Sequence, residues 1–326
     1  MAGLRQDQVA LYTKDMYKAE REGYEQIPTV YDKIFKIVSG VKGAGDKSTQ
    51  ILGAGALVRH TVEGQDVKFK TPVQGWEYLV KYHTYSDGIA LTKEAVEDTV
   101  KLGNLLKDLA NTWGISVRVE KESMAARVFN EGGTLSGDWV FNGTHTNNTD
   151  SSGDLMYDSA PQFNLSNNTR ATKNGGTYYT SIAGLTLTPA HFETVYNLHT
   201  TTNNRDERDR VISNPADTIL VEPGSNFFLA ERIVDTGRGM PFSELNDKNP
   251  YYKMLKPLAW DYLDDGAFYI GKAQSPAWQF HQRQKPEIRM FRDEKNLGYK
   301  ASINLRQGIL LKDFRTWSRG GGSSDA

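Results

Sequence analysis

The chain has 326 residues, 38% of them hydrophobic, and its 39 basic side chains nearly balance its 40 acidic ones. This length and composition allow a substantial buried core and more than one domain, whereas the near-zero net charge gives no general attraction for nucleic acid or an anionic membrane. The absence of cysteine excludes disulfide cross-links and thiolate chemistry.

The N-terminal region, residues 1–39, is expected to form short, mostly polar helical segments that are broken at Gly23 and Pro28. Residues 1–26 lack the apolar stretch of a signal peptide, and no later run reaches membrane-spanning length, so no membrane association is expected. Apolar residues at intervals of four indicate that the last segment is helical: Val30, Ile34 and Val38. The region has too few apolar positions to bury a core and is interpreted as an arm.

The stretch GVKGAGDKST, residues 40–49, comes within one residue of the spacing of a phosphate-binding loop. Asp46 intervenes before Lys47 and Ser48, and its carboxylate would face the phosphates. A phosphate-binding loop also needs a strand before it and a helix after it, whereas a helix is expected before this one. We therefore interpret residues 40–49 as a flexible joint.

Residues 55–71 alternate in polarity around a Glu63-Gly64 turn, which is typical of a β-hairpin. Its basic members include Arg59, Lys68 and Lys70. An isolated hairpin is marginally stable in water, so this one is expected to need another surface.

A long helix is expected from an N-cap at Thr92 to Asn130. Unbroken, it would span roughly 55 to 60 Å at about 1.5 Å per residue, and Gly103 and Gly114 could bend it. The expected apolar stripe comprises Val96, Val100, Leu106, Leu109, Trp113 and Val117.

Residues 132–180 are rich in Asn, Thr, Ser and Gly and are expected to be long surface loops. After them, Pro189 following Thr188 predicts a helix start, and residues 218–221 read as a buried strand. A second helix is expected to begin at a cap on Ser225 or Asn226 and to end by Gly237. These elements indicate an α/β layer.

The last third of the chain reads as strands joined by tight turns, of which Asp264-Asp265-Gly266 is one. The final eight residues, RGGGSSDA, are expected to be flexible by composition.

Evidence for an enzyme is weak. His191 and His199 are eight residues apart on the predicted helix, about 12 Å at 1.5 Å per residue, which is too far to share one metal. They are interpreted as surface or interface histidines, and Asp264 and Asp265 as solvated turn residues. We therefore expect no catalytic, cofactor-binding or metal site and no cofactor. The tyrosines of GGTYYT and NPYYKML leave a carbohydrate-binding or base-stacking module as an alternative.

Five motifs, taken together and in order, resemble the major capsid proteins of tailed phages, in particular the Mu-like major head subunit group. They cover roughly residues 78–237 and read GIALTKEAVED, AARVFNEG, FNGTH, GGTYYTSIAGLTLTPAHFETV and ADTILVEPGSNFFLAERI. Each motif alone is weakly specific, and it is their combination that favours the family.

The resemblance implies an α+β Hong Kong 97-type capsid fold with an extended β-hairpin loop, a long spine helix in a peripheral domain and an axial α/β domain. In those terms the parts are the arm 1–48, the extended loop 49–84, the peripheral domain 85–131 with 286–326, and the axial domain 132–285.

The implied function is that of a major capsid protein whose hexamers and pentamers build an icosahedral shell around double-stranded DNA. Another virion assembly protein remains an alternative. The resemblance also implies assembly in the host cytoplasm, a portal, weak non-specific contact with packaged DNA and a separate scaffolding protein, the last because the arm begins at Met1; a decoration protein is left open. Assembly contacts are expected at Tyr31, Phe35, Arg59, Lys68, Phe69 and Lys70.

Overall fold

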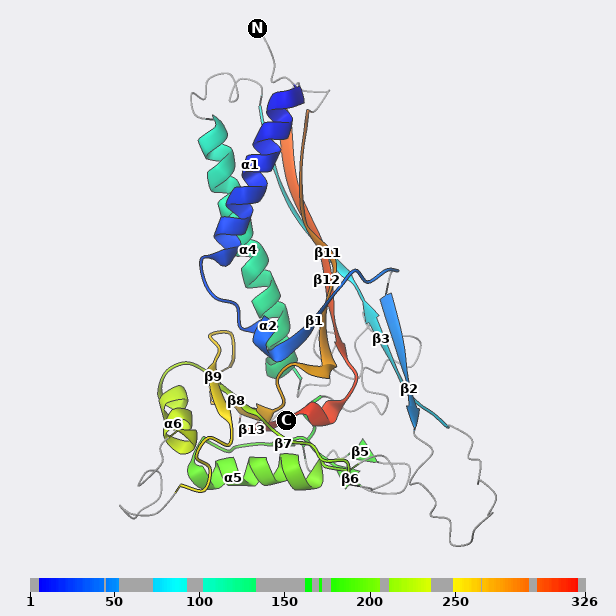
Figure 1. Ribbon diagram of the computed structural model, residues 1–326, viewed down its shortest axis with the longest axis vertical. Helices are drawn as coiled ribbons and strands as arrows, with labels where there is room; N and C mark the ends of the chain where they lie inside the picture. Colours follow the sequence, from blue (N-terminus) through cyan, green and yellow to red (C-terminus); the bar gives the residue numbers. More distant parts are fainter. Residues whose placement is uncertain are drawn as a thin grey trace, which may run out of the picture. The chain divides into compact units, whose positions relative to one another are not determined.

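The chain forms two compact units in a computed structural model (Figure 1). The first comprises Met1–Ala44, Lys81–Ala126 and Gln279–Ile309, and the second comprises Gly45–Val80, Arg127–Trp278 and Leu310–Ala326. The structure describes residues 6–43, 45–52, 73–92, 102–132, 162–165, 170–171, 177–205, 211–235, 249–264, 266–292 and 298–321. The predicted boundaries of arm, loop and domains stay predictions.

Two helices dominate the first unit. Helix α1 (Gln6–Glu25) is continuous, so the break expected at Gly23 is wrong. A Cβ atom on Gly23 would lie 2.2 Å from the carbonyl oxygen of Asn111 on helix α4. Gly23 is therefore a point of close helix contact, and packing outweighs its low helix propensity.

Helix α4 (Leu102–Asn130) confirms the long predicted helix and its end. Its 29 residues correspond to about 43 Å at 1.5 Å per residue. Of the predicted stripe, Leu106, Trp113 and Val117 are buried and Leu109 packs against them. Residues 93–101, which would hold the first part of the helix, lie outside the described residues.

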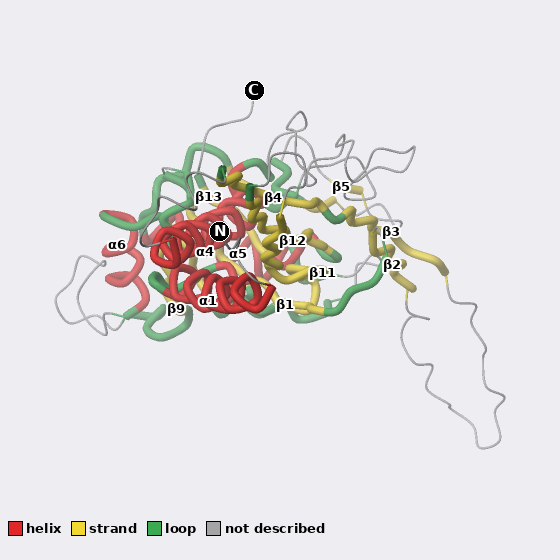
Figure 2. The backbone as a smooth tube through the Cα atoms, turned by 90° about the horizontal axis from the view of Figure 1, so that it is seen from above, coloured by secondary structure: helices red, strands yellow, loops and turns green. Residues whose placement is uncertain are grey.

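A four-stranded sheet of the first unit packs against these helices, in the order β1-β11-β12-β4. The strands are β1 (Phe35–Ser39), β4 (His83–Leu91), β11 (Ser275–Arg292) and β12 (Tyr299–Leu311). Strands β12 and β4 are antiparallel, with Tyr299 opposite Leu91 and Gln307 opposite His83. Figure 2 shows α1 and α4 on the same side of the sheet.

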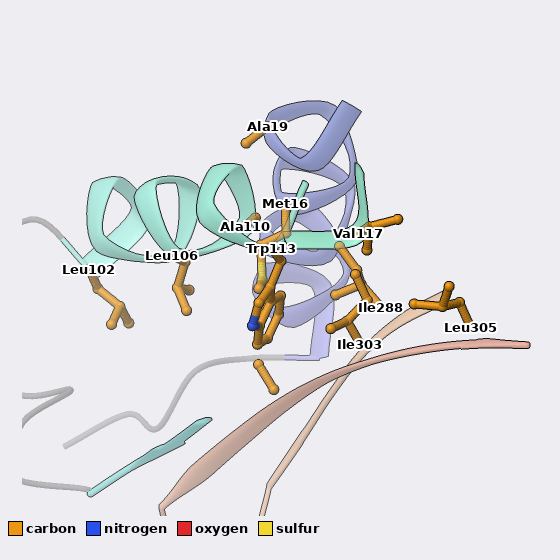
Figure 3. Close-up of a cluster of buried hydrophobic side chains, with 11 residues drawn as sticks. Met16, Ala19, Leu102, Leu106, Ala110, Trp113, Val117, Ile288, Ile303 and Leu305 are labelled. Atoms are coloured by element: carbon orange, nitrogen blue, oxygen red, sulfur yellow. The ribbon is translucent and has the colours of Figure 1, made fainter. Parts of the chain in front are cut away.

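Alternate residues along β12 are buried, which turns Ala301, Ile303 and Leu305 toward the helices. They meet Trp113 of α4 and Met16 of α1 in one hydrophobic cluster (Figure 3). Residues 1–39 contribute Met16 and Ala19 to this cluster, so they bury apolar surface against the rest of the first unit and not in a core of their own.

The helix expected to run to residue 39 is limited to the single turn α2 (Tyr31–Ile34). Strand β1 follows at once, because the chain turns extended at Phe35, with φ −94° and ψ 143°. Ile37 and Val38, both β-branched, suit a strand, and pairing with β11 gives β1 hydrogen-bond partners along one side.

The expected joint at residues 40–49 is correct only in part. Gly40 and Gly43 adopt positive φ angles of 79° and 98°, as a turn requires. Strand β2 (Gly45–Leu52) then begins and pairs with β3 (Val73–Lys81). A strand after the turn leaves no helix N-terminus for a phosphate, which supports the rejection of a phosphate-binding loop. The predicted hairpin core, residues 55–71, lies outside the described residues.

The second unit is built on a five-stranded sheet in the order β7-β13-β10-β8-β9. The strands are β7 (Ser181–Ile182), β8 (Thr218–Val221), β9 (Lys256–Ala259), β10 (Phe268–Gly271) and β13 (Trp317–Gly320). Strand β8 is fully buried and has the predicted bounds. It pairs antiparallel with β10 and parallel with β9. A separate short pair, β5 (Arg170–Ala171) and β6 (Thr177–Tyr178), lies in the segment expected to be loops.

Helices α5 (Pro189–Asn197) and α6 (Ser225–Val234) belong to this unit. Helix α5 starts at Pro189 as predicted, and Thr188 caps it, because its side chain accepts a hydrogen bond from the backbone N–H of His191. A π-helical turn, Leu198–Thr202, extends α5. The cap of α6 is Gly224, with φ 107°, and not Ser225 or Asn226; the Asn226 amide instead donates to Glu222 at 2.6 Å.

The flexible tail was predicted to begin at Arg319, but Arg319 and Gly320 are the last two residues of strand β13. Strand β13 lies between β7 and β10 and is buried throughout, following a short 3₁₀ turn (Phe314–Thr316). A Cβ atom on Gly320 would lie 2.3 Å from the Phe268 ring, so this glycine allows close packing rather than flexibility. Residues 322–326 lie outside the described part of the chain.

Candidate functional site

The closest approach between α1 and α4 is made by glycines. A Cβ atom on Gly114 of α4 would lie 2.0 Å from the Glu20 carbonyl oxygen of α1. Gly23 makes the reciprocal approach from α1, and Gly103 lies against the Tyr12 ring, where a Cβ would be at 3.2 Å. The two helices therefore pack backbone against backbone, a separation that larger side chains would prevent.

A groove opens beside this helix contact, within the first unit. Its volume is about 510 Å³, and it is lined by five residues of α1, one of α4 and three of β11. Tyr17 fastens α1 to one wall: its hydroxyl donates to the Ile288 carbonyl at 3.1 Å and accepts from the Ile288 N–H at 2.9 Å. The groove is thus part of a tightly held helix-on-sheet arrangement.

Two residues that line the groove, Lys121 and Glu20, are oppositely charged and buried. Lys121 of α4 is 6% exposed and Glu20 of α1 is 9% exposed. Burial lowers the pKa of Lys121 to about 8, and Glu20 offsets this while nearby Lys285 adds to it. Burial likewise raises the pKa of Glu20, with Lys121 opposing. In both residues desolvation outweighs the mutual attraction, so the pair is poorly compensated.

The Lys121 ammonium lies 4.6 Å from the centroid of the Tyr24 ring and 3.5 Å from the Tyr24 hydroxyl. That hydroxyl is 2.8 Å from the hydroxyl of Tyr31. Burial, followed by the contact with Tyr24, raises the pKa of Tyr31. A lysine ammonium has three donors, and a single hydrogen bond at 3.5 Å leaves most of its capacity unused.

Next to this pair, Glu122 fixes the start of α2. Its carboxylate accepts hydrogen bonds from the backbone N–H groups of Val30 at 2.6 Å and Tyr31 at 3.3 Å. A carboxylate at a helix start satisfies donors that have no partner inside the helix. Glu122 therefore has a structural role in the turn between α1 and β1.

Tyr31 and Phe35, two of the predicted assembly contacts, are buried in the first unit, with exposed fractions of 3% and 0%. Tyr31 packs against Phe280, their ring centroids 4.9 Å apart. Their burial leaves little of either side chain for a neighbouring copy. The other predicted contacts lie outside the described residues: Arg59, Lys68, Phe69 and Lys70.

His199 is fully buried, so its assignment as a surface or interface residue is wrong. Its Nδ1 lies 3.2 Å from the Ser318 hydroxyl, and burial lowers its pKa to about 4. His191 is held locally, with its Nδ1 2.7 Å from the Thr186 carbonyl. The described part of the chain contains no group of three or more His, Asp or Glu side chains placed to hold a metal.

The aromatic residues of the second unit are largely used in its core. Phe129, at the end of α4, contacts Trp260, Tyr269, Trp278 and Trp317, with ring centroids 5.0 to 5.8 Å apart. Tyr178 of GGTYYT is buried and packs against Phe314. Packing therefore accounts for much of the aromatic content that suggested a sugar- or base-stacking module.

Several large apolar side chains are exposed, and of these only Tyr252, in NPYYKML, was noted from the sequence. In the first unit these are Leu11, Tyr17, Ile27, Leu105, Val119 and Phe291. In the second unit they are Val211, Ile212, Phe228, Tyr252 and Met254. No local pattern separates them from core residues, because exposure depends on the tertiary arrangement.

Within the ranges that the structure describes, none of the helices has the length and apolarity needed to span a bilayer.

No family model and no curated protein sequence matches the chain. Solved structures do match it. A virus-like particle from Pyrococcus furiosus is 9% identical with a TM-score of 0.52, covering 94% of this chain and 98% of the other. The mature capsid of bacteriophage PhiM1 is 7% identical with a TM-score of 0.52, covering 90% and 87%. The capsid of a native GTA particle is 11% identical with a TM-score of 0.50, covering 91% of each chain.

At these identities the likeness is one of fold. The chain has the α+β Hong Kong 97-type fold, which confirms the predicted fold class.

Proposed function

We propose that this chain is the major capsid protein of a tailed bacteriophage, which assembles into the hexamers and pentamers of an icosahedral shell around double-stranded DNA. The supporting observation is the extent of the structural likeness. Chains from three particle shells match 90% to 94% of this chain and are themselves covered to 87% or more. Little of the described chain is therefore left to form an unrelated functional domain.

The surface of the chain fits a repeated building block. Shell subunits need heterologous contacts, in which different patches of the same chain meet. Exposed apolar side chains occur in both units, including Leu11 in the first at 58% and Phe228 in the second at 63%. Each apolar contact is worth roughly 25 cal/mol per Å² buried, so many modest contacts per copy stabilise a shell.

The balance of charged residues in the chain is also consistent with a shell that encloses DNA without condensing it. With 39 basic and 40 acidic side chains, the chain has no excess of positive charge with which to condense DNA. Weak, non-specific contact with packaged DNA is accordingly part of the proposal. So are a virion location, assembly in the host cytoplasm, a separate scaffolding protein and a portal.

Expression of the chain alone, and together with its candidate scaffolding protein, tests the function. Electron microscopy and analytical ultracentrifugation should show rings, sheets or closed shells of capsid size. Tubes would instead indicate another virion assembly protein. A stable monomer under all these conditions, particularly one retained on a glycan array, would contradict the capsid assignment and favour the carbohydrate-binding alternative.

A further inference from the structure

The groove between α1, α4 and β11 has more positive than negative charge. Among its lining residues, Arg21, Lys121 and Lys285 are cationic, and Glu20 and Glu25 are anionic. Arg21 and Glu25 are paired with each other, with Arg21 Nε 2.8 Å from the Glu25 carboxylate. Glu20 faces Lys121. Lys285 is exposed and forms no ion pair with any other residue that the structure describes, so one positive charge is left over.

We propose that this groove receives an acidic side chain of a second copy of the chain, with its carboxylate placed between Lys121 and Lys285. The inference rests on the proposed capsid function and assigns one contact within it.

Lys121 points to a missing acceptor. Its side chain is more than nine-tenths buried, yet the one hydrogen bond it makes to the described residues is the 3.5 Å contact with Tyr24. Burying a charge is favourable only when the remaining donors are satisfied. Lys285 makes the site more positive, as its effect on Lys121 shows. A carboxylate at this position would give both ammonium groups an acceptor and cancel the surplus charge.

The size and lining of the groove favour a protein segment over a free ion. A volume of about 510 Å³ exceeds what one small anion fills, since a water molecule occupies about 30 Å³. Tyr17, Tyr24 and Pro286 add apolar wall that an inorganic ion would not use. Each copy has 40 acidic side chains, and the formal net charge of −1 gives only weak repulsion between copies.

Zero-length cross-linking tests the contact directly. Particles are assembled from an equal mixture of ¹⁴N- and ¹⁵N-labelled chains and treated with a carbodiimide, which joins a carboxylate to a lysine amine only when the two touch. Mass spectrometry should find Lys285 or Lys121 joined to Asp or Glu in peptide pairs of mixed isotope, which identify links between copies. Links from these lysines to their own copy alone, in particles that show mixed links elsewhere, would overturn the proposal.

Charge reversal provides the second test. Lys285→Glu should raise the protein concentration needed for assembly by about tenfold or more, because it places a carboxylate opposite the incoming one. Lys36→Glu is the matched control, since Lys36 is an exposed lysine of the same unit on β1 and does not line the groove. It should change that concentration by less than about twofold. Equal effects of the two variants would count against the groove.

The experiments distinguish failure of the groove contact from failure of the proposed capsid function. Wild-type particles with neither mixed links at the groove nor sensitivity to Lys285→Glu would refute the groove and leave the capsid function intact. A wild-type chain that never assembles would refute the function and the groove with it. Circular dichroism of both lysine variants establishes that they are folded.

Discussion

Gly114 of α4 lies directly against Glu20 of α1, so close that a Cβ atom on the glycine would come within 2.0 Å of the glutamate's carbonyl oxygen. Glu20 also interacts with Lys121, which lies about two helix turns after Gly114 on α4. Close backbone packing and a poorly compensated buried charge pair thus occur at one helix contact. The close packing at Gly114, which stabilises the contact of α1 with α4, can therefore be tested separately from the buried charges, which destabilise it.

Gly114→Ala should destabilise the first unit by about 2 to 4 kcal/mol, because the added methyl group meets backbone that cannot move aside. In an exposed helix position, replacement of glycine by alanine would instead stabilise by about 1 kcal/mol. Urea unfolding and the hydrogen exchange of α1 amides measure the effect. Asn104→Ala, an exposed position of the same helix, is the control and should be neutral or slightly stabilising. Unchanged protection of α1 in Gly114→Ala would contradict the close contact.

The double substitution Glu20→Gln with Lys121→Met should stabilise the unassembled chain by about 1 to 2 kcal/mol at pH 7, because it removes two incompletely compensated buried charges. The folded pKa of Lys121, about 8, lies below its ordinary 10.5. Folding therefore becomes more favourable as the pH rises from about 8 to 10.5, and this rise should vanish in the variant. Thermal unfolding between pH 7 and 10.5 measures it.

An exposed ion pair on α1 provides the matched control for the buried Glu20 and Lys121. Lys18 and Glu22 are 3.9 Å apart with side chains 80% and 62% exposed. Lys18→Met with Glu22→Gln should change stability little, because solvent screens the pair. If the two double substitutions change the free energy of unfolding equally, the buried pair does not destabilise the chain more than an exposed pair does. If the groove receives a carboxylate, the buried double should also assemble less well despite its higher stability.

His199 predicts an acid-sensitive second unit. Its pKa of about 4 in the folded chain lies below the ordinary 6.5, so the neutral form is the one that folds. This contribution is fully present above pH 6.5 and is lost as the pH falls toward 4, by up to about 3 kcal/mol. Thermal unfolding from pH 7 to 4 should show this loss, and His199→Gln should reduce it. His191→Gln, at a less buried position of the adjoining helix, should retain it.

Phe228 provides a test of assembly that is independent of the groove. Its side chain is 63% exposed on α6, whereas neighbouring Phe227 packs against the core of the second unit. Phe228→Asp should leave the unfolding midpoint within about 0.5 kcal/mol of wild type and raise the concentration needed for assembly. Phe227→Asp should lower stability itself. Normal assembly by Phe228→Asp would remove this residue from the contact surface.

Local signals were enough for several elements. The type and C-terminal end of α4, the start of α5 at Pro189 and the apolar run of β8 were predicted correctly. Each depends on residues close together in the chain: periodic apolar side chains for a helix face, a proline at the first helical position for a helix start. The fold class was predicted from the order of such motifs and their resemblance to phage capsid proteins. A phosphate-binding loop at residues 40–49 was rejected because a helix was expected before it, whereas strand β1 lies there; strand β2 after the turn is what disfavours such a loop.

The candidate site was accessible to sequence reasoning only in small part. Gly23 and Gly114 read locally as helix breakers, yet both are places where α1 and α4 touch. Tyr31 and Phe35 read as contacts for another copy, yet their own unit buries them. Nothing near Lys121 in the sequence marks it as buried, because Glu20 and Lys285 approach it from positions about 100 and 160 residues away.

By itself the sequence determined which stretches prefer to be helix, strand or turn, and the approximate balance of charge that any surface could carry. The tertiary structure alone decided that α1 docks on α4, that Arg319 and Gly320 belong to an inner strand and not to a free tail, and that His199 and Lys121 are buried away from solvent. The physical reason is range: propensity and capping act over a few residues, whereas burial and pairing depend on segments brought together from distant parts of the chain.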